Sequence, residues 1–281
     1  MKIATWNINS ARARVDRILD VLDRHDLDVL ALQEIKCKPE QFPTAEIESA
    51  GYEIAAHGLN QWNGVAIISR VGIADVRTEF TGQPGFKKGE PAEGELFIAG
   101  PVEARAIGAR VGAERANDGG LVGGIDLWSL YVPNGRAVGD PHYHYKLAWL
   151  EALQAAKAEK LAAKPEKKIA LVGDFNVIPT DADVWDPAAM DNGLYLTDAE
   201  RAAFFAFEDA GFVEVSRQFA TNYTFWDYQR LRFPKNEGMR IDFVYASPAL
   251  AAAAVAGEID RDERKGKGAS DHVPVIIEFD L

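Results

Sequence analysis

Cysteine is almost absent from this chain of 281 residues, in which Cys37 is the only one. A single thiol excludes an internal disulfide, so the composition fits a reducing compartment. No uninterrupted apolar run reaches the roughly 18 residues needed to span a bilayer. The first residues, MKIATWNINS, also lack the apolar stretch of a signal peptide. We therefore expect a cytoplasmic protein of bacterial type that has no membrane association.

Motifs of several common enzyme classes are missing as well. The sequence contains no G-x-x-x-x-G-K-[ST] phosphate loop, no G-x-G-x-x-G fingerprint and no G-x-S-x-G elbow. These absences argue against a P-loop nucleotide hydrolase, a dinucleotide-binding enzyme and a serine hydrolase of the elbow type.

Positive charge is in deficit, because 31 basic residues face 43 acidic ones and give a formal charge of -12. This balance argues against a general polyanion binder, whose surface is usually basic. A local basic patch or a bound divalent metal can still reverse the field at one site. If nucleic acid binds, its basic contacts should concentrate on one face.

Apolar residues make up 47% of the chain, which is enough for a sizeable core, and we expect a single domain over residues 1–281. Strand patterns outnumber helical ones and many are neighbours in sequence. This favours an α/β fold of the α+β type, with two largely antiparallel sheets packed together and helices outside. Predicted strands lie at 2–8, 28–32, 52–56, 65–69, 126–132, 168–173, 223–226, 241–246 and 273–279. Predicted helices begin at a Ser10 cap, span 39–50 and 141–163, and lie near 198–210, with loops at 82–95 and 112–124.

Acidic and amide residues recur where these strands end. In LVGDFN an apolar strand runs into Asp174 and Asn176, and residues two apart on an extended chain share a face. Each such residue alone is more often a turn or a solvated terminus than a ligand. Together they supply hard oxygen donors, amides and one imidazole. The other members of the set are Asn7, Glu34, Asp242, Asp271 and His272.

This donor set predicts a chemistry. Carboxylates without clustered Cys or His suit Mg²⁺ or Mn²⁺ better than Zn²⁺. A metal beside acidic residues and a His–Asp pair indicates hydrolysis of a phosphate ester, because the metal neutralises phosphoryl oxygens while a base delivers water.

The same residues carry a resemblance to the exonuclease III family of AP endonucleases, within the endonuclease/exonuclease/phosphatase superfamily. Matching stretches occur in order over residues 5–275: TWNINSARAR, DVLALQEIKCKPEQFP, NGVAIISR, SLYVPNG, VGDFNVIPTDADVWDP, TFWDYQ, MRIDFVYAS and SDHVPV. The resemblance implies a four-layer sandwich of two mixed sheets flanked by helices. It also implies a monomeric, Mg²⁺-dependent enzyme acting on double-stranded DNA with abasic sites or 3′ ends.

The resemblance implies roles for the acidic residues at the metal and the water. Glu34 is similar to the principal metal ligand of the family, with Asn7 and Asp271 near the metal. Asp174 matches the aspartate that orients or deprotonates the attacking water, and Asn176 is implied to hold the phosphate region.

Further roles follow on the substrate side. Tyr131 and Asn134 resemble phosphate contacts, His272 the histidine at the scissile phosphate, and Asp242 the carboxylate that orients it. Trp226 resembles the aromatic that packs against the abasic sugar.

Basic residues near these motifs are candidate DNA contacts. Arg230 lies in a basic and aromatic segment after Trp226, and Lys36 follows the metal-binding glutamate. The loop between Gln83 and Asp126 is longer than in compact family members, and the Gly-rich stretch 119–124 has no role that we can assign.

Two other functions stay open at the level of sequence. One is a phosphodiesterase of the same superfamily that acts on inositol phosphates, sphingomyelin or the tails of RNA. The other is a DNA-binding scaffold without catalysis, against which the complete acid, amide and histidine set argues.

Overall fold

A computed structural model describes residues 1–116, 119–190 and 193–281 of the chain. Its strands form two six-stranded sheets. The first sheet has the order β11-β12-β1-β2-β4-β3, in which β1 runs parallel to β2 and the other neighbours are antiparallel. Its strands are β1 Lys2–Asn7, β2 Val29–Gln33, β3 Glu53–His57, β4 Val65–Ser69, β11 Ala254–Ile259 and β12 Val275–Phe279.

The second sheet has the order β5-β6-β7-β8-β10-β9, with β7 and β8 as its parallel pair. Its strands are β5 Ile73–Arg77, β6 Ala106–Arg115, β7 Leu121–Tyr131, β8 Ile169–Asp174, β9 Val213–Glu214 and β10 Asp242–Ala246. The α-helices are α1 Val15–Arg24, α2 Thr44–Ser49, α3 Pro141–Ala163, α4 Asp198–Asp209, α5 Arg232–Lys235 and α6 Pro248–Ala251.

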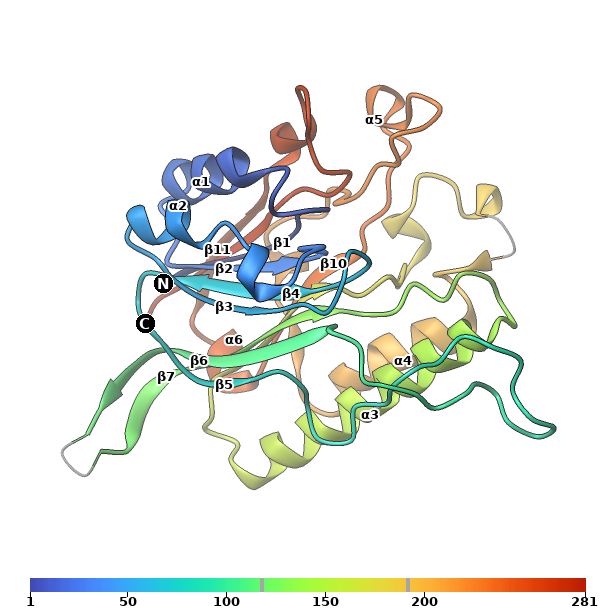
Figure 1. The fold of residues 1–281 in the computed structure, drawn as a ribbon, viewed down its shortest axis with the longest axis horizontal. Coiled ribbons are helices and arrows are strands. Elements are labelled where there is room, and N and C mark those ends of the chain that lie inside the picture. The colour runs from blue at the N-terminus through green and yellow to red at the C-terminus, as the bar shows by residue number, and fades with distance from the viewer. Residues whose placement is uncertain (117–118, 191–192) are drawn as a thin grey trace.

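The two sheets pack face to face and helices cover their outer faces (Figure 1). Alternate residues of each strand enter different cores, as the period of an extended chain requires. In β2, for example, Val29 and Ala31 face the core between the sheets, whereas Leu30 and Leu32 face the core beneath α1 and α2. A third core joins the second sheet to α3 and α4. The predicted four-layer sandwich is therefore confirmed.

Two predicted helices begin or end differently. Ser10 does not cap the first helix, which begins at Val15 after Arg14. The Ser10 backbone N–H instead donates to the carbonyl of Glu34. The helix predicted over 39–50 is divided into a 3-10 turn at Pro39–Gln41 and the helix α2, with Pro43 immediately before α2, because proline has no N–H to continue the ladder.

Two predictions in the strands and loops are also wrong. Most of the stretch 112–124 is a paired ribbon, since β6 continues to Arg115 and β7 begins at Leu121; residues 117–118 of that prediction lie outside the described part. The ribbon projects away from the sandwich at the lower left of Figure 1. The strand predicted at 223–226 does not form, and Phe225 makes only isolated bridges to Met239 and His272.

Strand direction explains why the polar strand ends meet. Parallel strands end at the same edge, so Asn7 lies opposite Gln33 and Tyr131 lies opposite Asp174. The antiparallel strand β10 places its first residue, Asp242, opposite Asp174. Among the described residues, no helix has the length and apolarity to cross a membrane.

Candidate active site

The acidic strand ends converge between the two sheets. Ligand atoms of Glu34, Asp174 and His272 all lie within 4.8 Å of one another. Glu34 follows β2 in the first sheet, His272 precedes β12 of the same sheet, and Asp174 ends β8 in the second sheet. The cluster therefore exists only where both sheets are packed together.

Asn7 joins the two carboxylates. Its Nδ2 donates to Glu34 Oε1 at 2.9 Å and to Asp174 Oδ2 at 3.0 Å. Its Oδ1 accepts the backbone N–H of Asn9 at 3.1 Å. Because Asn7 is fully buried at the end of β1, it fixes the separation of two acids that come from different sheets.

Asp174 is a buried carboxylic acid whose pKa is raised. Burial, with the charges of Asp242 and Glu34, raises the pKa of Asp174 to about 7, although His272 and the Asn7 hydrogen bond oppose the shift. The backbone N–H of Asn176 donates to its Oδ1 at 2.9 Å. A carboxyl group that titrates near neutral pH suits a general base.

Asn176 does not share a face with Asp174 in the way an extended chain predicts. The strand ends at Asp174 and Asn176 has a left-handed backbone with φ 50°. Its side-chain Nδ2 donates to the carbonyl of Val132 at 2.9 Å. The turn, and not the strand spacing, brings Asn176 beside Asp174.

His272 and Asp242 form a buried pair. Nδ1 of His272 donates to Asp242 Oδ2 at 2.8 Å, and Thr224 Oγ1 donates to the same oxygen at 2.6 Å. Burial disfavours a charged imidazole, but Asp242 and Asp174 outweigh it and raise the pKa of His272 to about 10. The ring is thus an imidazolium at neutral pH, and its Nε2 lies 3.8 Å from Asp174 Oδ2.

Tyr131 lies at the end of β7, with the guanidinium of Arg105 4.8 Å from its ring centre. Burial raises the pKa of Tyr131 well above its ordinary value, and the charge of Glu34 adds to the shift. The phenol is therefore a neutral hydrogen-bonding group.

The residues present fit a divalent cation. Burial alone would raise the pKa of Glu34, but Lys36 and Asn7 lower it, so this carboxylate is ionised. Lys36 Nζ lies 2.8 Å from Glu34 Oε2. Because the protonated His272 donates its Nδ1–H to Asp242, it is a poor metal ligand. Oxygen donors from Glu34 and its neighbours are therefore the better ligands.

Asp271 lies outside the cluster of Glu34, Asp174 and His272 that can hold an ion. Asn9 Nδ2 donates to Asp271 Oδ1 at 3.0 Å. The backbone carbonyl of Asp271 accepts the backbone N–H of Trp226. Its place in the metal site stays a prediction.

Comparison with known proteins now gives the family. The model of the Endonuclease/Exonuclease/phosphatase family matches residues 4–272. The chain belongs to this family. The more specific resemblance to exonuclease III and the AP endonucleases is confirmed by relatives over the full length of the chain.

Among the curated relatives, an Exodeoxyribonuclease of Bacillus subtilis is 28% identical, covering 99% of this chain and 98% of the relative. The DNA repair nuclease APEX1 of Danio rerio is 29% identical, covering 99% and 81%. Among solved structures, an AP endonuclease from Archaeoglobus fulgidus has a TM-score of 0.84 at 30% identity over 100% of both chains. The 3′ phosphatase NExo from Neisseria, bound to a product DNA hairpin, has a TM-score of 0.85 at 31% identity over 100% of both chains. The protein is thus a phosphodiesterase nuclease of a DNA-repair family.

The aromatic ring in contact with His272 is that of Phe225, whereas the predicted aromatic was Trp226. The Trp226 side chain is fully buried and packs on Phe233 with ring centres 5.2 Å apart. The Phe225 ring lies 4.8 Å from the imidazole of His272. Neighbouring residues of an extended segment face opposite ways, but this alternation does not tell from the sequence which of the two faces the histidine.

Phe225 also lines a cavity of about 300 Å³. Its other walls include Trp185, Tyr195 and Met239, with Arg136 and Asp227 adding charge. None of these lining residues was predicted from the sequence, because they come from loops with no strand or helix pattern.

Two of the remaining predicted contacts, Lys36 and Asn134, have hydrogen-bond partners of their own. Lys36 Nζ donates to Asn9 Oδ1 at 2.6 Å as well as pairing with Glu34. Asn134 Oδ1 accepts the N–H of Arg136 at 3.1 Å, which forms a turn after β7. Arg230 has a left-handed backbone with φ 57° in the loop that leads to α5.

Proposed function

We propose that this nuclease is a metal-dependent DNA-repair phosphodiesterase that cleaves the backbone 5′ to abasic sites. We include 3′→5′ exodeoxyribonuclease and 3′-phosphatase or phosphodiesterase activity in the proposal. The observation that carries it is the buried cluster of Glu34, Asp174 and His272, in which a base and an imidazolium face each other across 3.8 Å.

Asp174 serves as the acceptor of the proton of the attacking water. The Asn176 N–H and Asn7 Nδ2 each donate to one of its oxygens, so the carboxylate is oriented before substrate arrives. Its pKa of about 7 lets it take a proton at neutral pH, as an efficient general base must.

His272 stabilises negative charge at the scissile phosphate. Asp242 keeps the ring charged and oriented through Nδ1, so the Nε2–H is free to donate to a phosphoryl oxygen. A preorganised charged donor in a buried site is among the strongest ways to stabilise such a transition state. Tyr131 and Asn134 are the proposed neutral donors, and Asn176 orders the phosphate region.

Glu34 is the proposed principal ligand of Mg²⁺, for which Mn²⁺ is a substitute, with Asn7 and Asp271 nearby. When bound, the ion supplies Lewis acid character that neutralises phosphoryl oxygens.

The cavity beside Phe225 is the proposed place for a sugar that lacks its base. Its walls combine apolar and charged side chains, and Phe225 also touches the histidine of the site. Enzymes that act on single nucleotides commonly extrude them from the helix into such a pocket.

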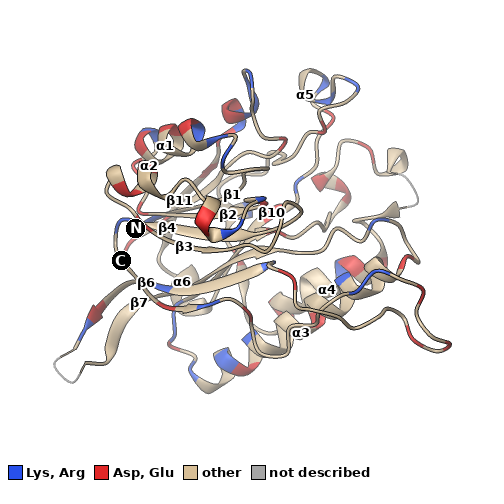
Figure 2. Cartoon of the chain, viewed as in Figure 1, with Lys and Arg blue, Asp and Glu red and all other residues tan. Residues whose placement is uncertain are grey.

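Double-stranded DNA is the proposed partner of a monomeric enzyme. Lys and Arg lie in loops around α5 and before α1, whereas acidic residues dominate the outer faces of α1 and α2 (Figure 2). Basic residues also lie on the far end of α3 (Figure 2), so they are not confined to one face. Arg230 and Lys36 are the proposed phosphate contacts on the site side.

The test is cleavage of end-labelled duplexes, one with an abasic site and one intact, with and without Mg²⁺. We expect an incision 5′ to the abasic site that EDTA abolishes, and slower trimming of the intact duplex from its 3′ end. Asp174→Asn should remove the incision while the protein stays folded. Asp126→Asn is the matched control, because Asp126 is another buried aspartate whose position on β7 lies opposite the start of β8. Near-normal incision by Asp174→Asn would refute the mechanism, and cleavage of inositol phosphates or sphingomyelin alone would refute the substrate.

A further inference from the structure

A buried lysine of α3 contacts the turn that follows Asp174. Lys146 belongs to α3 and is fully buried. Its Nζ donates to the carbonyl oxygen of Asn176 at 2.6 Å and pairs with Glu200 Oε1. The ammonium group therefore joins the helical layer directly to the turn that carries Asn176.

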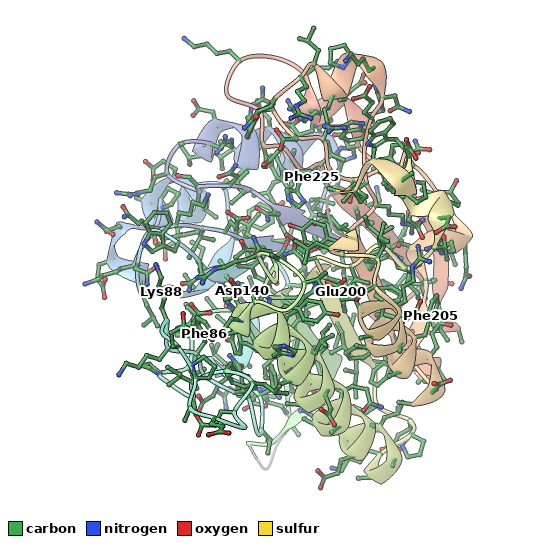
Figure 3. The ribbon with its side chains drawn as sticks, turned by 90° about the vertical axis from the view of Figure 1, so that its right-hand side faces the viewer. Phe86, Lys88, Asp140, Glu200, Phe205 and Phe225 are labelled. Atoms are coloured by element: carbon green, nitrogen blue, oxygen red, sulfur yellow. The ribbon has the colours of Figure 1, made fainter. Side chains whose placement is uncertain are left out.

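Glu200 is committed on both of its oxygens. While Oε1 meets Lys146, Oε2 accepts the N–H and Oγ1–H of Thr197 at 3.2 and 2.9 Å, which caps the start of α4. Thr197 Oγ1 in turn lies 2.8 Å from the hydroxyl of Tyr143 on α3. Figure 3 shows Glu200 at the end of α4 that lies beside the start of α3, near Asp140. Lys146 is thus held by a rigid junction of two helices.

The turn at Asn176 needs such support. The Asn176 φ of 50° lies in the left-handed region, which asparagine tolerates better than most residues but which still costs energy unless the surroundings favour it. Three polar groups of Asn176 are engaged: the backbone N–H with Asp174, the side-chain Nδ2 with Val132 and the backbone carbonyl with Lys146. The first of these bonds orients the proposed base, so a shift of the turn would move Asp174 Oδ1 away from its donor.

Stability alone does not explain why a buried ion pair occupies this place. Burying two charges usually costs about as much as their attraction returns, and apolar replacements are often neutral or better. We propose that Lys146 is a positioning residue, which with Glu200 clamps the Asn176 turn in the geometry that the reaction requires. This inference rests on the proposed function of the site.

The chain contains a matched control on the same helix. Lys157 is also buried, but its Nζ lies over the ring of Trp128 at 3.2 Å, with no contact to the site. Replacing either lysine removes one buried amino group from α3, and only Lys146 is bonded to the catalytic turn.

The experiment compares Lys146→Met with Lys157→Met in steady-state incision of the abasic duplex, at a temperature where each variant is folded. We expect Lys146→Met to lower kcat by about 100-fold, the size of effect known for slight misplacement of catalytic groups, while KM stays near that of the unmodified protein. Lys157→Met should leave both constants unchanged. Equal kcat values for the two variants would overturn the inference, because the loss would then follow from replacing any buried lysine of α3.

Glu200→Gln decides the matter if Lys146→Met fails to fold. Gln keeps an oxygen for Thr197 and leaves the lysine in place, so we expect a smaller fall in kcat, with KM again unchanged. Unchanged kcat in Glu200→Gln would overturn the role of the pair. If the unmodified protein does not incise abasic DNA at all, the proposed function fails instead, so the two failures are distinguishable.

Discussion

The charge on His272 depends most strongly on the neighbouring carboxylate of Asp242. Asp242 Oδ2 accepts the Nδ1–H at 2.8 Å and also the hydroxyl of Thr224. Without that carboxylate, burial would oppose the charged ring, because a buried imidazole ordinarily loses its proton more easily. The charged state of the proposed phosphate donor is therefore set by a residue that need not touch the substrate.

Asp242→Asn should shift the alkaline side of the pH profile of kcat/KM to lower pH. The pKa of His272 is raised to about 10 by Asp242 and Asp174 against burial. The imidazolium persists below that value and is lost as pH rises through it. Removing the Asp242 charge lowers the pKa, so the imidazolium, and the activity with it, is lost at lower pH. Asp126→Asn is the control, and an unmoved alkaline limb in Asp242→Asn would contradict the role of the pair.

The two neighbouring aromatics should respond differently to substitution. Phe225→Ala removes a wall of the cavity beside His272 and should raise KM for an abasic duplex by about 10-fold, roughly the effect of 1.4 kcal/mol of lost binding. Trp226→Ala should instead destabilise the fold by about 3–5 kcal/mol, as for other buried aromatics. KM on abasic and intact 3′-end substrates, with urea unfolding, separates these outcomes. If Trp226→Phe raised KM and Phe225→Ala did not, the prediction that Trp226 packs against the abasic sugar would be restored.

At the scale of elements, β8 must approach β7 closely just before it ends. A Cβ at Gly173, which has φ 149°, would lie 1.9 Å from the carbonyl oxygen of Leu130. Glycine is therefore required one residue before Asp174, where the two parallel strands are in register.

Gly173→Ala should lower the free energy of unfolding by about 1–3 kcal/mol, the usual cost of forcing atoms into a packed site. It should also lower kcat, because relief of the clash separates β8 from β7 and moves Asp174. Ala170→Gly, in the same strand, tests whether loss of activity simply follows loss of stability. Full activity in a destabilised Gly173→Ala protein would show that Asp174 tolerates the shift.

The sequence predicted elements whose signal is local. Apolar strands such as β8 and the long helix α3 lie where their patterns put them, because both faces of such strands are covered. The acids of the site were also recognisable, since a carboxylate at the end of an apolar strand needs a partner.

What the sequence did not predict depends on contacts between distant segments. The ribbon of β6 and β7 forms because each strand supplies the hydrogen-bond partners of the other, although Gly123 and Gly124 there resemble loop residues. The contact between Phe225 and His272 was not predicted, because Phe225 is placed by isolated bridges and not by a strand. The contact of Lys146 with Asn176 joins residues 30 positions apart, which no local pattern records.

For the molecule as a whole, buried titratable groups make the free energy of unfolding depend on pH. Burial lowers the pKa of Lys157 from 10.5 to about 6, although Asp126 opposes the shift. Between these values the unfolded chain holds a proton that the folded protein has released. The contribution of Lys157 to the free energy of unfolding should therefore rise with pH across this window, whereas His272, whose pKa is raised to about 10, contributes in the opposite direction.

Lys157→Met should remove this contribution of Lys157, so the free energy of unfolding should increase less, or decrease more, with pH than in the unmodified protein. The measurement is urea unfolding at several pH values between about 6.5 and 9.5, inside the window in which a group of this kind changes its proton count. Lys164→Met is the control, because Lys164 is an exposed residue just after α3. Identical pH slopes in the two variants would show that Lys157 remains charged in the folded protein.

The order of the site residues along the chain has a consequence for synthesis. Glu34 is made early, Asp174 and Asp242 later, and His272 only near residue 281, yet these groups face one another only when both sheets have docked. A ribosome-bound fragment that ends before His272 holds most of the fold and lacks the imidazolium. Such a fragment should not cut DNA, so the nuclease becomes active only after His272 has been synthesised and β12 has paired with β1.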